Sequence, residues 1–183
     1  MRYLLFIALL IPLSSLAQKT NCVRIKNTPP SVRLKHYPFN EAARVLAVSY
    51  VADSNSYGIL LRKTDYALPV KNDTICYSKL HEIVSLNASQ IDTLTDILFN
   101  YKQKGNIDFG AACYRPRNAL IFLNAKGESF AYLEICFECE GIRANNEKNT
   151  INSLCFKQYE LLKILFTNAG IRYGPETTIF NGI

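Results

Sequence analysis

Apolar residues spaced three and four positions apart predict a helix at about residues 88–104. Asn87 and Gln90 stand three apart just before the apolar run, which is the spacing of a capping box at a helix N-terminus. Lys102 and Lys104 would lie in the last turn, where positive charge interacts favourably with the helix dipole. The pattern therefore predicts both ends of this helix as well as its buried face.

The same spacing predicts a second helix at about residues 153–169. Gly170 follows as a C-terminal stop, and Ile171 can fold back onto Phe166 as in a Schellman motif. The apolar stripe of this helix consists of Tyr159, Leu162, Leu165 and Phe166.

Runs rich in β-branched and aromatic residues predict strands at residues 44–51, 59–62 and 81–86. A β-hairpin is predicted over residues 118–139, with a three-residue loop in which Gly127 is left-handed. The chain thus reads as strands, helix, hairpin and helix. This order predicts an α+β fold, an antiparallel sheet with two helices packed on one face.

The hairpin loop also predicts a register in which Asn124 faces Glu128. In that register Cys113 lies opposite Cys139, while Cys136 points to the other face of the sheet. One shared core should then contain Leu94, Leu98, Ile121, Leu133, Ile135, Leu162 and Phe166.

The N-terminus has the three parts of a secretory signal peptide, which are a positive head, a short apolar run and small residues before a cleavage site. We expect residues 1–17 to be the signal, with cleavage between Ala17 and Gln18. Residues 18–40 are polar and punctuated by proline, so we expect an extended lead-in, followed by a single α+β domain over 41–183. The expected location is extracytoplasmic, either periplasmic or secreted.

Charge and hydropathy narrow the possible partners only slightly. The net charge of the chain is +6, and the signal would remove one positive residue, Arg2. The remaining charge is not gathered into a basic arm, so the sequence carries no nucleic-acid signature. No segment after the signal is long and apolar enough to predict a membrane span. The partner itself cannot be inferred from the sequence.

Six cysteines follow the expected signal, and an even number in an exported chain predicts disulfides. The disulfide candidates are Cys113, Cys136 and Cys139. One alternative is thiol–disulfide exchange at the Cys136-Phe-Glu-Cys139 motif, which the neighbouring acidic residues disfavour because negative charge opposes a thiolate. Another alternative is a zinc site made of Cys113, Cys136, Cys139 and Cys155, although the chain lacks the second Cys-x-x-Cys of a zinc ribbon. Fifteen full pairings of six cysteines are possible, so connectivity stays open.

Three segments carry a resemblance to a known group. They are Cys113-Tyr-Arg-Pro-Arg117, the Cys136-Phe-Glu-Cys139 motif, and the closing Ala169-Gly-Ile-Arg-Tyr173-Gly. Together they resemble a group of small exported bacterial proteins of unknown function, over roughly residues 80–174. The resemblance implies export but no activity, cofactor or metal. We therefore expect a non-enzymatic binding or envelope-associated role, with a metal-binding or thiol-redox protein as the alternative.

Overall fold

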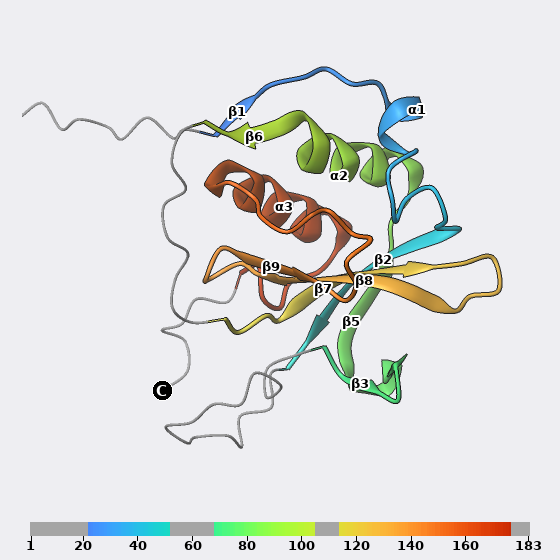
Figure 1. Ribbon diagram of the computed structural model, residues 1–183. Coiled ribbons are helices and arrows are strands. Elements are labelled where there is room, and N and C mark those ends of the chain that lie inside the picture. Colours follow the sequence, from blue (N-terminus) through green and yellow to red (C-terminus); the bar gives the residue numbers. More distant parts are fainter. Residues whose placement is uncertain (1–21, 52–67, 105–113, 177–183) are drawn as a thin grey trace, which may run out of the picture.

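The computed structural model describes residues 22–51, 68–104 and 114–176. Its centre is a five-stranded antiparallel sheet, and two helices cover one face of that sheet (Figure 1). In spatial order the strands are β5 (Leu80–Ser85), β2 (Arg44–Tyr50), β7 (Asn118–Leu123), β8 (Ser129–Cys136) and β9 (Gly141–Ala144). The covering helices are α2 (Ala88–Asn100) and α3 (Phe156–Ala169). The predicted α+β fold is confirmed. The predicted strand at 59–62 lies outside the described residues.

Smaller elements surround this sheet. β1 (Cys22–Arg24) pairs with β6 (Tyr101–Gln103), and β3 (Val70–Lys71) pairs with β4 (Thr74–Ile75). The remaining elements are the short helix α1 (Pro30–Arg33) and the 3₁₀ helix η1 (Tyr77–Lys79). The β3–β4 hairpin lies on the side of the sheet opposite the helices (Figure 1).

The lead-in to the domain is attached to α2 rather than simply extended. Arg33 on α1 is buried, forms an ion pair with Asp92 and donates a hydrogen bond to Thr95 Oγ1 at 3.1 Å. Arg24 on β1 donates two hydrogen bonds of 2.7 Å to the carboxylate of Asp96. From Cys22 onward the lead-in therefore belongs to the fold.

The helix predicted at residues 88–104, which is α2, begins as predicted but ends early. Its capping box is present, because Gln90 N donates to Asn87 Oδ1 and Asn87 N donates to Gln90 Oε1, each at 2.9 Å. The helix stops at Asn100, so the prediction that Lys102 and Lys104 occupy its last turn is wrong. The cause is the strand β6, in which the residues after Asn100 become extended and pair with β1.

The helix predicted at residues 153–169, which is α3, ends as predicted. Gly170 adopts a left-handed conformation with φ of 104°, and Ile171 N donates to Phe166 O at 3.0 Å. This is the Schellman arrangement expected from the sequence. The helix begins at Phe156, three residues later than predicted, with Cys155 at the N-cap.

The hairpin loop is confirmed, but the register of its strands is not. Asn124 N donates to Glu128 O at 2.9 Å and Gly127 is left-handed with φ of 81°, as predicted. A β-bulge between Phe122 and Leu123 then shifts the pairing by one residue. The extra residue on β8 is Phe130, which packs against the helix-side core and contacts the ring of Tyr37.

Side chains alternate along a strand, so the shift of one residue places the side chains of β7 on the opposite faces of the sheet from those expected. Ile121 lies on the face away from the helices, so the prediction that it shares a core with Leu133 and Ile135 is wrong. Leu120 and Phe122 take its place under α2 and α3. The other six residues of the predicted core are buried together.

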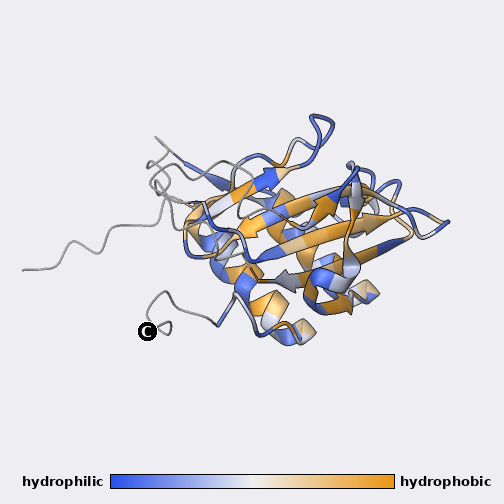
Figure 2. Ribbon diagram, turned by 90° about the horizontal axis from the view of Figure 1, so that it is seen from below, coloured by the Kyte–Doolittle hydropathy of each residue, from blue (hydrophilic) through white to orange (hydrophobic). Residues whose placement is uncertain are grey.

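The sheet therefore has an apolar layer on each face, and its strands are largely hydrophobic in Figure 2. The helix-side core contains Val45, Ala47, Leu94, Leu98, Leu120, Phe122, Leu133, Ile135, Leu162 and Phe166, among others. The opposite core is smaller and contains Leu46, Val48, Tyr50, Leu68, Ile75, Ala119, Ile121 and Leu123.

Candidate functional site

A disulfide joins Cys22 in β1 to Cys155 at the N-cap of α3, with Cα atoms 5.6 Å apart. The sequence predicted disulfides without this pairing. The bond removes Cys155 from the four-cysteine zinc site considered above, because a disulfide sulfur is not a thiolate ligand. Cys155 falls inside the helix predicted at about residues 153–169, so no local pattern indicated this pairing.

The Cys-x-x-Cys motif lies in the turn that joins β8 to β9. Cys136 is the last residue of β8 and pairs with Gly141. The prediction of a strand running through Cys139 is wrong, because the chain reverses direction between Cys136 and Gly141. Cys113 lies outside the described residues, so its predicted position opposite Cys139 stays a prediction.

One backbone N–H group in this turn donates a hydrogen bond to a cysteine sulfur. Cys139 N donates a hydrogen bond to Cys136 Sγ at 3.2 Å, and Glu140 adopts a left-handed conformation with φ of 47°. Both cysteines are buried, with exposed fractions of 1% and 4%. Burial of both sulfurs slows their reaction with thiols from solution.

One of the acidic residues in the motif is paired with a cation in the folded protein. Arg117 forms an ion pair with Glu138, and its guanidinium lies 6.0 Å from the ring centroid of Tyr173. Arg143 lies over the ring of Tyr114 at 4.3 Å. The negative charge of Glu138 is therefore balanced by Arg117.

The segments that carry the resemblance to the exported group meet at this end of the sheet. Asn118 Nδ2 donates to Tyr173 O at 2.9 Å, and Gly174 lies so close that a Cβ there would be 1.9 Å from Asn118 Oδ1. Glu82 accepts hydrogen bonds from the backbone N–H groups of Arg172 and Tyr173 at 3.0 and 3.1 Å. These contacts fix the chain after α3 against the sheet, which is a structural role.

A buried carboxyl group lies on the face of the sheet away from the helices. It was not among the candidate residues identified from the sequence. Glu134 on β8 is 3% exposed and accepts a hydrogen bond from Leu68 N at 2.5 Å. Burial raises the pKa of this carboxyl group. Burial also raises the pKa of the nearby Tyr50, whose hydroxyl has no hydrogen-bond partner among the described residues. The alternation of side chains along β8 is the signal that places Glu134 on the face opposite Leu133 and Ile135.

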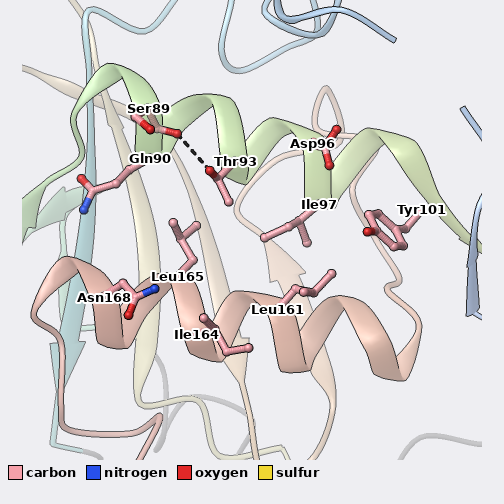
Figure 3. A pocket seen from close by; sticks show the side chains of 10 residues that line it. All are labelled: Ser89, Gln90, Thr93, Asp96, Ile97, Tyr101, Leu161, Ile164, Leu165 and Asn168. Carbon is pink, nitrogen blue, oxygen red and sulfur yellow. Dashed lines mark hydrogen bonds between the residues drawn. The ribbon is translucent and has the colours of Figure 1, made fainter. Parts of the chain in front are cut away.

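Two surface hollows flank α3. The first, about 350 Å³, lies between the antiparallel helices α2 and α3, with Ser89, Gln90 and Asn168 at one end and Tyr101 at the other (Figure 3). The second, about 360 Å³, lies between α3 and the β8–β9 turn. Its lining consists of Phe137, Glu140, Phe156, Lys157, Tyr159, Glu160, Lys163 and Ile164.

Metal ligands are not gathered in the part of the chain that the structure describes, where no three His, Cys, Asp or Glu side chains are placed to hold an ion. No helix among the described residues is long and apolar enough to cross a membrane. Comparison with known proteins gave no match to a family model, and none to a curated protein or a solved structure.

Proposed function

We propose that the chain is an exported, disulfide-stabilised domain with a non-enzymatic role, binding a partner in an extracytoplasmic compartment. The observation that carries this proposal is the bond between Cys22 and Cys155. Disulfides form and persist in oxidising compartments and are rare in the cytosol. Cleavage after Ala17 would leave Cys22 within the first few residues of the mature chain, where the bond ties that end to α3.

A surface on the helix layer supports binding as the role. Phe156 and Ile164 are large apolar residues on α3 with exposed fractions of 47% and 56%. Ile164 borders both hollows. Exposed apolar residues beside a concave surface are typical of interaction sites.

Export can be tested by expressing the full chain in a bacterium with a periplasm, trapping thiols by alkylation before lysis, and fractionating the cells. The control variant Leu9→Arg interrupts the apolar run of the signal. We expect the wild type in the periplasm or medium with Cys22 and Cys155 protected from alkylation. The variant should stay in the cytoplasm with both cysteines alkylated. A cytoplasmic, fully alkylated wild type would contradict the proposal.

A second candidate function is thiol chemistry at the β8–β9 turn, through zinc binding or reversible oxidation. The hydrogen bond from Cys139 N to Cys136 Sγ favours it, because bound thiolates accept such bonds. Cys136 and Cys139 would supply two ligands, and Cys113 is the candidate for a third.

This second candidate predicts about one equivalent of zinc in natively purified protein, or a Cys136 thiol that oxidises reversibly. Cys136→Ser should abolish either property, whereas Cys76→Ser should leave it unchanged because Cys76 lies beside η1, away from the turn. Protein without zinc and without a reversibly oxidised thiol would dismiss this candidate and leave the binding role in place.

A further inference from the structure

The lead-in and the segment after α2 are basic and contain no acidic residue. Neither residues 22–40 nor residues 101–104 include an aspartate or a glutamate. Pairing of β1 with β6 brings the two segments together, with Val23 opposite Lys102. They lie on the side of the molecule away from the β3–β4 hairpin (Figure 1). The fold therefore gathers positive charge that is divided between two distant parts of the sequence.

The two arginines of the lead-in bind the acidic residues of α2. Arg24 donates hydrogen bonds to both carboxylate oxygens of Asp96, and Arg33 Nη1 lies 3.5 Å from Oδ1 of the same carboxylate. Arg33 also forms an ion pair with Asp92. β1 and α1 are therefore held on the same side of α2, and the negative charge of that helix is balanced.

Four lysines on these segments remain available to an external partner. They are Lys26, Lys35, Lys102 and Lys104, which are all exposed and form no ion pair within the described residues. Cys22 is bonded to the N-cap of α3 and Arg24 to α2, so both point from β1 toward the helices. Side chains alternate along a strand, so Val23 and the facing Lys102 point away from the helices.

Aliphatic side chains lie among these lysines. Ile25, Val32 and Leu34 have exposed fractions of 41%, 41% and 40%. Val32 and Leu34 are the neighbours of Arg33, whose side chain is buried against α2. The lead-in thus uses its arginines for the fold and presents lysines and aliphatic residues to the outside.

We propose that this surface, formed by residues 25–35 and 102–104, binds the surface of an anionic lipid bilayer. The lysines attract the headgroups, and the aliphatic side chains enter the boundary between headgroups and acyl chains. Single-stranded nucleic acid would instead call for aromatic side chains on which bases stack, and none of the three exposed apolar residues is aromatic. The inference rests on the proposed export, which would bring the chain to such a surface, and it names a partner for the proposed binding role.

The attraction should be moderate and sensitive to salt. Each lysine close to an anionic bilayer contributes about fivefold to the binding constant, so four lysines contribute on the order of several hundredfold. Dissolved ions screen charges on an exposed surface, so binding should weaken as the salt concentration rises.

The experiment is co-sedimentation with vesicles of phosphatidylglycerol and phosphatidylcholine in equal parts, and with vesicles of phosphatidylcholine alone. The protein is the oxidised mature chain beginning at Gln18, which can be produced with any export signal, so lipid binding and natural export are tested separately. We expect binding to the mixed vesicles only, and less of it at high salt.

The charge contribution is tested by removing two lysines at a time. Lys102→Gln combined with Lys104→Gln should lower the binding constant about 25-fold. The matched control is Lys71→Gln combined with Lys79→Gln, on β3 and η1. These lysines are also exposed, but they lie with the β3–β4 hairpin, so the control should change binding by less than about twofold.

The apolar contribution is tested with Ile25→Gln, and Ile83→Gln on β5 is its control. The two isoleucines have similar exposed fractions, 41% and 47%. We expect the first variant to bind about three- to tenfold more weakly and the second to bind as the wild type does, with circular dichroism confirming that both fold. Equal binding to both kinds of vesicle, equal effects within either pair of variants, or binding to an oligonucleotide but not to vesicles would each overturn the proposal.

Discussion

Cys22 and Cys155 are 133 residues apart in the sequence, and their disulfide brings their Cα atoms to 5.6 Å. The bond joins β1 to the start of α3, and β1 is paired with β6 directly after α2. Both helices of the layer are therefore fixed at the same end, one by strand pairing and the other by a covalent bond. This arrangement makes the N-terminal strand part of the helix layer rather than a tail.

Loss of this bond should lower the free energy of unfolding substantially. A cross-link that closes a loop of more than 100 residues restricts the unfolded chain, and its loss through Cys22→Ser should cost about 3–5 kcal/mol. Cys155→Ser should cost no more, because serine is a favourable N-cap residue. Urea unfolding measures the difference, and the reduced wild type should match Cys22→Ser. Equal midpoints for oxidised wild type and Cys22→Ser would contradict this role.

Gly174 should tolerate alanine far less well than Gly170. Both glycines are left-handed, with φ of 95° and 104°, so the backbone strain of an alanine is similar at each. Only at Gly174 does a Cβ meet another group, the Asn118 amide; at Gly170 nothing lies within 4 Å. We expect Gly170→Ala to cost about 1 kcal/mol and Gly174→Ala about 2–4 kcal/mol in thermal unfolding. Similar costs would show that the contact with Asn118 is not tight.

Glu134 should make stability fall as the pH rises. Burial raises the pKa of its carboxyl group, opposed by the hydrogen bond from Leu68 N and by the charge of Arg143. The folded state therefore binds the proton more tightly than the unfolded state does, and this contribution is lost as the pH passes the folded pKa. Glu134→Gln keeps an acceptor oxygen without the charge. Its stability relative to wild type should increase between pH 4 and pH 7, and a constant difference would refute the assignment.

Glu82 should have the opposite pH dependence. Burial alone would raise its pKa, but hydrogen bonds from Ser49 Oγ and from the N–H groups of Arg172 and Tyr173 outweigh burial and lower it. The stabilisation is therefore present above the pKa of an unfolded glutamate and is lost as the pH falls through the lower folded value. Glu82→Gln should be less stable than wild type by about 1–2 kcal/mol near neutral pH. That difference should shrink in acid, and a difference that grew in acid would be incompatible with this account.

Local signals in the sequence were sufficient for elements whose ends are determined by adjacent residues. The capping box at Asn87 and the left-handed stop at Gly170 depend on contacts within a few positions, and both were predicted correctly. The hairpin loop ending at Gly127 was predicted for the same reason.

Features that depend on distant partners were not predictable in this way. The bulge places Phe130 against Tyr37, which lies far away in the sequence. The early end of α2 follows from pairing of Tyr101 with Arg24. The partner of Cys22 is equally distant in sequence, because β1 is held beside β6 and bonded to the N-cap of α3.

The measurement that tests the central claim most directly is a peptide map under non-reducing conditions, made on natively exported protein. The account predicts a mature N-terminus at Gln18 and a linked pair of peptides containing Cys22 and Cys155, which separate on reduction. Protein that retains residues 1–17 and carries Cys22 and Cys155 as thiols would contradict it.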